Sequence, residues 1–98
     1  METVFTWDPT KAETNLRKHE ISFETAVEAF DDPFQVVQEN DLVGDEQRLT
    51  LVGMTRRLML VLVVFVDRTG DKHTEVLRLI SARKANEYEK GSYEDQFR

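Results

Sequence analysis

A cluster of cations near the C-terminal end of the chain has the residue types and the spacing that could bind a phosphate group. Arg78 interrupts the apolar segment 76–80, and Ser81, Arg83 and Lys84 follow it closely. An ionised side chain within an apolar segment is costly unless it is paired or hydrated, so Arg78 is expected to do more than pack. Guanidinium groups, a hydroxyl and the N–H groups at a helix start can together hold a phosphate and the additional negative charge of its transition state.

These donors are the minimum for RNA cleavage without a metal ion, in which the ribose 2′-hydroxyl attacks the adjacent phosphorus, and a general base would still be needed. Arg68, after the preceding apolar segment, is a further candidate donor, and Glu75 or Asp67 is the candidate general base. The alternative interpretation is structural: Ser81 caps a helix, Arg78 pairs with a carboxylate, and the other cations are solvated. Capping serines and surface cations are frequent, so the pattern by itself favours the structural interpretation.

The composition predicts a single globular domain and excludes several kinds of site. The 98 residues include no cysteine, which excludes disulfides and thiolate metal ligands. The only histidines, His19 and His73, fall on different predicted elements, so a metal site is not expected. Neither a Gly-rich phosphate loop nor a Gly-x-Ser-x-Gly motif is present. We therefore expect no metal and no cofactor.

Hydropathy indicates a cytoplasmic protein without membrane contact. The N-terminus lacks the basic start and the apolar segment of a signal peptide. The longest apolar run, residues 58–66, is far shorter than the ~20 residues that a membrane helix needs.

The charge is distributed unevenly along the chain, with a net value of −6. Residues 1–50 contain four Lys or Arg against twelve Asp or Glu, whereas residues 51–98 contain nine against seven. An anionic ligand is therefore expected on the C-terminal half. A protein that coats nucleic acid in general would be basic overall, so bulk attraction to phosphate is excluded as the mechanism.

The first third of the sequence predicts a strand followed by two helices. Residues 4–7 are typical of a strand, and Asp8-Pro9 then provides an N-cap and a first helical residue. This helix is expected to end near Lys18-His19, with Ala12, Leu16 and His19 on its buried side. Ser22 is the candidate N-cap of a second helix that reaches Phe30, and Asp31-Asp32-Pro33 stops it as a turn.

The rest of the chain predicts an antiparallel sheet and a final helix. Residues 34–37 are a candidate extended segment, and the acidic segment 39–46 is expected to be an exposed loop. Strands are expected at 48–54, 58–66 and 74–80, with Arg56-Arg57 in a hairpin loop. Ser81 or Ala82 would open a last helix that runs to about Lys90, and Gly91-Ser92 would break it. The predicted fold class is α+β, in the order β-α-α-β-β-β-α, with a mainly antiparallel sheet packed by helices.

Four blocks of the sequence resemble the BrnT family of type II toxin–antitoxin systems. The blocks are residues 5–12 (FTWDPTKA), 15–23 (NLRKHEISF), 29–33 (AFDDP) and 79–85 (LISARKA). They occur in the family's order, and the resemblance extends from residue 5 to about residue 93. It implies a RelE-like domain over residues 1–98 that cleaves RNA as an endoribonuclease and inhibits translation.

The resemblance also implies partners and site residues. The partners would be RNA and a BrnA-like antitoxin with a ribbon-helix-helix part, through which the complex would reach operator DNA. The implied catalytic residues are Arg68, Glu75, Arg78, Ser81 and Arg83, and the implied substrate-binding residues are Lys84, Arg78 and Arg83. The acidic role falls to either Glu75 or Asp67.

Two features depart from the family pattern. Residues 69–75 lengthen the link before the last strand, which bears on the roles of Arg68 and Glu75. The last helix, expected to be basic, carries four acidic residues between 85 and 96 against Lys90 alone. An acidic helix would weaken RNA binding and would suit a more basic antitoxin. The alternative function is therefore a catalytically weak or inactive module that docks an antitoxin and co-regulates its operon.

Overall fold

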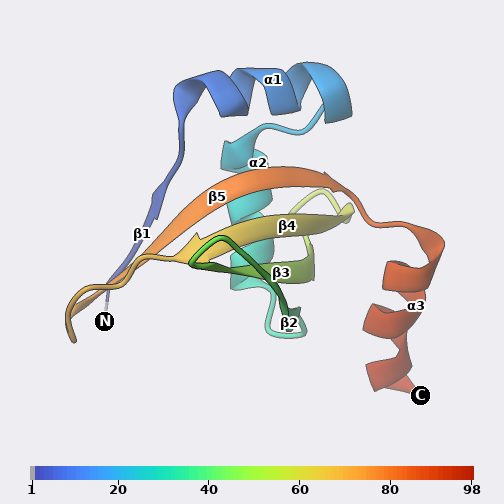
Figure 1. The fold of residues 1–98 in the computed structure, drawn as a ribbon. Helices are drawn as coiled ribbons and strands as arrows, with labels where there is room; N and C mark the ends of the chain where they lie inside the picture. Colours follow the sequence, from blue (N-terminus) through green and yellow to red (C-terminus); the bar gives the residue numbers. More distant parts are fainter. Residues whose placement is uncertain (1) are drawn as a thin grey trace.

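One mixed five-stranded sheet carries the rest of the structure (Figure 1). A computed structural model describes residues 2–98, apart from the side chain of Asp41. The strands are β1 (Glu2–Thr6), β2 (Val36–Val43), β3 (Glu46–Met54), β4 (Leu60–Asp67) and β5 (Thr74–Lys84). They lie in the order β1-β5-β4-β3-β2. β1 runs parallel to β5, and the other neighbouring pairs are antiparallel.

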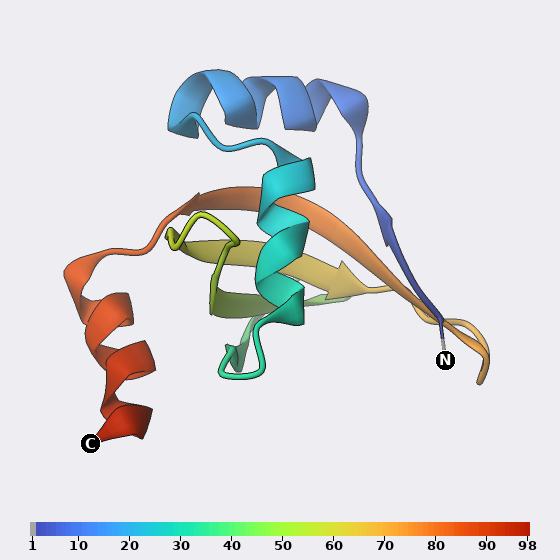
Figure 2. The same cartoon turned by 180° about the vertical axis from the view of Figure 1, so that it is seen from behind.

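Helices cover the two faces of the sheet unequally. They are α1 (Pro9–His19), α2 (Phe23–Val27) and α3 (Glu87–Glu94), with 3-10 helices at η1 (Glu28–Asp31) and η2 (Asp95–Phe97). α1, α2 and η1 pack on one face, whereas α3 lies at one end of the other (Figures 1 and 2). We call this second face, which carries Val52, Leu62 and Val64, the open face. No helix within residues 2–98 is long and apolar enough to cross a membrane.

The main core lies between the sheet and α1, α2 and η1. Its largest fully buried side chains are Phe23, Ile21, Leu51, Leu79, Val61 and Val63. The η1 backbone lies directly on β3 at Gly53, where an added Cβ would come within 2.7 Å of the Ala29 carbonyl oxygen. A smaller apolar cluster on the open face joins Val52 and Leu62 to Ala85 and Tyr93.

The predicted starts of the first two helices are confirmed by capping hydrogen bonds. The Asp8 carboxylate accepts a hydrogen bond from Thr10 N at 3.0 Å, and the Ser22 hydroxyl accepts one from Thr25 N at 3.1 Å. The predicted buried side of α1 is wrong at Leu16, which is 49% exposed. Asn15 is buried in its place, because it makes polar contacts that no apolar side chain could make.

Asn15 attaches α1 to β5 where β1 has ended. β1 pairs with β5 only as far as Arg78, so the backbone of β5 beyond it needs another partner. The Asn15 amide nitrogen donates to the Ala82 carbonyl at 2.9 Å, and its oxygen accepts from Ala82 N at 3.0 Å. The same nitrogen also donates to the Ile21 carbonyl at 3.0 Å. One side chain therefore replaces a missing strand neighbour.

The acidic segment 39–46 is not the predicted loop. Most of it belongs to β2 and β3, which form a hairpin around Gly44 with a φ of 63°. β2 is one of the two edge strands of the sheet, and its residues 37–40 are exposed. An exposed edge strand needs no apolar alternation and is protected from aggregation by charge, so its sequence looks like a loop. The element order therefore gains one strand.

The last strand and helix also begin and end elsewhere than predicted. β5 continues through Ser81 to Lys84, because residues 81–84 pair with residues 61–64 of β4. α3 starts after Asn86, which accepts from Glu89 N, while the Glu89 carboxylate accepts from Asn86 N, both at 2.9 Å. This reciprocal capping box fixes the start of the helix. α3 runs past Gly91-Ser92 to Glu94.

Asn15→Leu is expected to lower the free energy of unfolding by about 2–4 kcal/mol, because it leaves the N–H and C=O groups of Ala82 buried without partners. Chemical denaturation measures the loss. Thr14→Ala, a change at the exposed neighbouring position, is the control and should stay within about 0.5 kcal/mol of the parent. A similar small effect for Asn15→Leu would show that these bonds contribute little.

Candidate active site

A β-bulge in β5 places Arg78, Ser81 and Arg83 on the same face of the sheet. Side chains alternate along a strand, so Arg78 and Ser81 would normally face opposite sides. The register shifts by one residue between Leu79 and Ser81, with Ile80 as the extra residue. Arg78, Ser81 and Arg83 consequently pair with Val66, Val64 and Leu62 of the open face.

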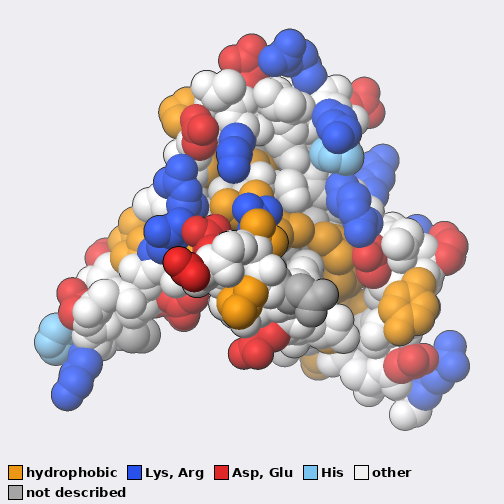
Figure 3. Space-filling view, in the orientation of Figure 1, with side chains coloured by type: hydrophobic (Ala, Val, Ile, Leu, Met, Phe, Trp, Pro, Cys, Tyr) orange, Lys and Arg blue, Asp and Glu red, His pale blue; other side chains and the backbone are white. Residues whose placement is uncertain are grey.

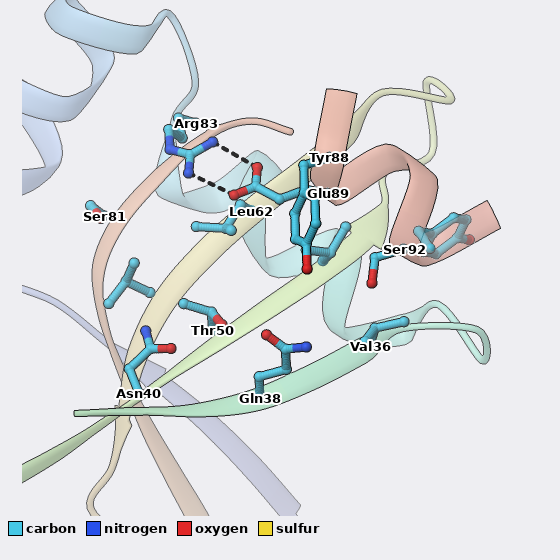
Figure 4. A pocket seen from close by; sticks show the side chains of 13 residues that line it. Val36, Gln38, Asn40, Thr50, Leu62, Ser81, Arg83, Tyr88, Glu89 and Ser92 are labelled. Atoms are coloured by element: carbon cyan, nitrogen blue, oxygen red, sulfur yellow. Dashed lines mark hydrogen bonds and ion pairs between the residues drawn. The ribbon is translucent and has the colours of Figure 1, made fainter. Parts of the chain in front are cut away.

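The open face is hollowed next to Ser81 and Arg83. The cavity has a volume of about 410 Å³, and strands β2 to β5 form its floor while α3 forms one wall (Figure 4). Its polar lining residues are Gln38, Asn40, Thr50, Ser81, Arg83, Tyr88, Glu89, Ser92 and Tyr93. Its apolar lining residues are Val36, Val52, Leu62 and Val64. Most of the lining is therefore polar, and its apolar part is confined to the floor, which suits a ligand that has both polar and apolar surfaces.

Arg83 is held in a two-bond ion pair at the edge of this cavity. Its Nη1 and Nη2 atoms donate to the two Glu89 carboxylate oxygens, each at 2.8 Å (Figure 4). The hydrogen bond to Glu89 raises the pKa of Arg83, and the hydrogen bond from Arg83 lowers the pKa of Glu89 against its partial burial. These two parallel hydrogen bonds to Glu89 fix the plane of the guanidinium group, so Arg83 is oriented before any ligand binds.

Asp32 holds α3, and therefore Glu89, against the sheet. Its carboxylate accepts hydrogen bonds from Phe34 N at 2.8 Å, Met54 N at 2.8 Å and the Tyr93 hydroxyl at 2.6 Å. Burial opposes the ionisation of Asp32, but the bonds from Tyr93, Phe34 and Met54 outweigh it and lower its pKa. Burial and the bond to Asp32 raise the pKa of Tyr93 to about 12. The predicted turn at Asp32-Pro33 is present, and it also carries this anchor.

Two further arginines differ in where they lie. Strand alternation places Arg48 on the open face with Thr50 and Val52, and its buried Nε has no hydrogen-bond partner among the described residues. Arg78 is partly buried and makes no ion pair or hydrogen bond with a described side chain. In the space-filling view of this side, Lys and Arg side chains border an apolar hollow (Figure 3).

The remaining predicted site residues lie away from this group. Arg68 pairs with Glu46 at 2.6 Å next to the β2–β3 hairpin. Glu75 accepts a hydrogen bond from Thr3 and lines a separate cavity with Asp67, on the face covered by helices. Lys84 is exposed at the end of β5 and does not line the cavity of Arg83. The structure thus brings together Arg78, Ser81 and Arg83 and separates both predicted general bases from them.

Sequence reasoning missed the residues that β2 and α3 contribute. Among the described residues, Glu89 is the one carboxylate that lines the cavity of Arg83, and the pattern Asn86-x-x-Glu89 would have indicated its capping role. Gln38 and Asn40 gave no signal, because they lie in a segment that resembles a loop. Among the described residues, no three His, Asp or Glu side chains gather into a group that could hold a metal ion.

Comparison with known proteins identifies the family. A family model described as "Ribonuclease toxin, BrnT, of type II toxin-antitoxin system" matches residues 7–89. The chain belongs to the BrnT family. The resemblance inferred from the four sequence blocks is thereby confirmed, and membership in a type II toxin–antitoxin family implies an antitoxin protein as partner.

A solved BrnT structure has a similar fold. The crystal structure of the Brucella abortus ribonuclease toxin, BrnT, matches with a TM-score of 0.53 and 25% sequence identity. The match covers 89% of this chain and 100% of that chain. A comparison with curated proteins gave no match. The α+β class is therefore that of a BrnT protein, with β2 and the longer β5 as corrections to the predicted element order.

Asp32→Asn is expected to lower the free energy of unfolding by about 2 kcal/mol at neutral pH, because an amide cannot accept all three hydrogen bonds. The lowered pKa of Asp32 stabilises the fold above the ordinary pKa of an aspartate, about 4, and this contribution is lost as the pH falls through the folded value. Stability in Asp32→Asn should therefore depend less on pH in the acid range than stability in the parent.

Denaturation curves measured from pH 7 down to pH 3 test this expectation. Asp31→Asn is the matched control, since Asp31 is exposed and forms only a long ion pair with Arg56 at 3.9 Å. Equal acid dependence in the parent and in Asp32→Asn would contradict the role given to the Asp32 carboxylate.

Proposed function

We propose that this BrnT protein is an active endoribonuclease that cleaves RNA on the open face of its sheet without a metal ion. The observation that carries the proposal is the common placement of Arg78, Ser81 and Arg83 on that face, next to a cavity. The bulge at Ile80 makes this placement, and a strand with regular alternation would not. The RelE-like relation that the family resemblance implies is part of this proposal.

In the proposed reaction, the ribose 2′-oxygen attacks the adjacent phosphorus and the 5′-oxygen leaves. The products are a 2′,3′-cyclic phosphate and a 5′-hydroxyl, and the proton lost by the 2′-hydroxyl balances the one that the leaving oxygen gains. The phosphorus gains negative charge in the transition state. Arg78 and Arg83 stabilise that charge, and the Ser81 hydroxyl donates to a phosphate oxygen. Arg48, whose Nε lacks a described partner, is a further donor from β3.

Proton transfer is assigned to water in this proposal. Glu75 and Asp67 lie on the opposite face of the sheet from Arg78, so neither reaches a phosphate bound there. Glu89 lies in the cavity, but its lowered pKa makes it a weak base. We therefore give Glu89 the role of orienting Arg83. Lys84 and Arg68 are left as surface cations that attract RNA.

The biological setting proposed for this activity follows from the family. The toxin would inhibit translation in the cytoplasm by cutting RNA, and a BrnA-like antitoxin with a ribbon-helix-helix part would neutralise it. The complex would reach operator DNA through the antitoxin. The exposed carboxylates of the β2–β3 hairpin and of α3, such as Glu39 and Glu87, support a basic antitoxin surface.

Purified protein free of antitoxin is expected to cleave RNA in the presence of EDTA, and Arg78→Ala should reduce the rate at least ~10²-fold, as loss of a transition-state donor does. Arg83→Ala should have a similar effect. Arg56→Ala is the matched control, because Arg56 lies in the β3–β4 turn, with its side chain 77% exposed, and pairs only with Glu28 and Asp31. Gel analysis of a labelled RNA measures the rates and the cyclic phosphate end.

Glu75→Gln is expected to retain cleavage, because its carboxylate lies on the face opposite Arg78. Its failure to cleave would reinstate Glu75 as the general base. Cleavage that stops with EDTA, or that is unchanged in Arg78→Ala and Arg83→Ala, would overturn the mechanism. An antitoxin-free protein that cuts no RNA would instead be a docking module.

A further inference from the structure

The floor of the open-face cavity has an apolar half and a polar half. The register aligns Val36, Val52, Leu62 and Arg83 in one row across four strands. The next row contains Gln38, Thr50, Val64 and Ser81. A flat heterocycle with an apolar face and polar edges matches such a floor, because its face can rest on valine and leucine while its edge meets amides and hydroxyls.

Tyr88 stands at the rim of this cavity as an exposed aromatic ring. It is 85% exposed on α3, although large aromatic side chains are usually buried. The ring projects from α3 toward the space above Thr50 and Gln38 (Figure 4). The aromatic pairs found among the described residues, including Tyr93 with Phe97, do not involve Tyr88. An unpartnered ring beside a polar hollow is the arrangement on which proteins stack unpaired bases.

The two amides of β2 are available to a ligand. Gln38 and Asn40 are exposed, and neither side-chain amide makes a hydrogen bond with another residue that the structure describes. An amide donates and accepts at once, so it can pair with two adjacent groups on a base edge. The hydroxyls of Thr50 and Ser92 extend the same lining.

The end of the cavity at Arg83 completes the match to a nucleotide. Arg83 is the last residue of the apolar row, on β5, and Glu89 fixes the plane of its guanidinium group. Ser81 is the last residue of the polar row, also on β5. A base that lies on the floor therefore has its sugar and phosphate directed toward β5. The cavity volume of about 410 Å³ is large enough for a base with its ribose.

We propose that this cavity is a nucleobase subsite for the RNA, and this proposal rests on the proposed function. Tyr88 stacks on one face of an unpaired base, and Val52 and Leu62 contact the other face. Gln38 and Asn40 read the base edge and so select the sequence at which the chain cleaves. The substrate class is single-stranded RNA, because a paired base would not present its edge to these amides.

Binding of uncleavable RNA tests the subsite separately from catalysis. Fluorescein-labelled 2′-O-methyl oligonucleotides of each base composition lack the attacking hydroxyl, and fluorescence anisotropy measures their Kd. Tyr88→Ala is expected to raise Kd ~10-fold, the effect typical of losing one stacking platform, and Tyr88→Phe should restore most of the affinity. Leu58→Ala, a change at an 80% exposed apolar side chain outside the cavity, is the control.

In Gln38→Ala and in Asn40→Ala, the ratio of Kd between the weakest-binding and the tightest-binding oligonucleotide is expected to fall ~10-fold. The Kd of the weakest-binding oligonucleotide itself should change less. The base preference of cleavage, read by sequencing the products from natural RNA, should shift in the same two variants. Both results would support base reading by β2.

The outcomes separate this proposal from the proposed function. If Arg83→Ala loses RNA binding while Tyr88→Ala, Gln38→Ala and Asn40→Ala match the parent in affinity and base preference, the subsite is overturned and the ribonuclease stands. If Tyr88→Ala weakens only the binding of the antitoxin, the face docks protein and the subsite is overturned. If the parent neither binds nor cleaves RNA, both proposals fail together.

Discussion

The buried carboxylate of Asp32 is the constraint on which the site depends. It accepts hydrogen bonds from Phe34 N, from Met54 N on β3 and from the Tyr93 hydroxyl on α3. α3 is short, and only Tyr93 within it is buried. The position of the helix therefore depends on that side chain and on the small apolar cluster around it. Without this anchor the cavity would lose the wall that carries Glu89 and Tyr88.

The bulge in β5 allows one strand to supply side chains both to the core and to the candidate site. Leu77, Leu79 and Ala82 are buried beneath the helices, while Arg78, Ser81 and Arg83 face the other way. With strict alternation, a strand that buried both Leu79 and Ala82 could not be built, because these residues would face opposite sides. Asn15 then binds the backbone of Ala82, just past the bulge, and secures the displaced segment to α1.

The sequence predicted what local interactions decide. The starts of α1 and α2 were correct, because Asp8 and Ser22 cap their own helices within three residues. The continuation of β5 past Ser81 was not predictable in the same way, since pairing with β4 outweighs the local preference of a serine followed by cations. β2 was missed for a related reason: an acidic edge strand carries the composition of a loop.

The candidate site was predictable only in part, because its residues are brought together by non-local strand pairing rather than by local interactions. Arg78 was indicated by its place in an apolar segment, and Arg83 by the family resemblance. The choice of Glu75 rested on closeness in sequence, but strand geometry places Glu75 on the opposite face. Gln38 and Tyr88 are 50 positions apart and join the cavity only through the sheet and the Asp32 anchor. Their residue types are also ordinary on a surface. Nothing local could have paired them.

The acidic residues of α3 are not only a source of repulsion toward an anionic ligand, because one of them, Glu89, also has a structural role. Glu89 neutralises Arg83 locally and also caps its helix, so it is a structural part of the cavity as well as a negative charge on the open face. The same pairing reduces the net positive charge available to attract phosphate, in a chain whose overall charge is −6. Affinity that arises from counterion release grows with the number of phosphates neutralised, and a cation that is paired with a carboxylate contributes less to it. Under the proposed function, recognition of RNA would draw more on contacts to bases than on general attraction to the backbone, which is the property expected of a sequence-selective nuclease rather than a general one.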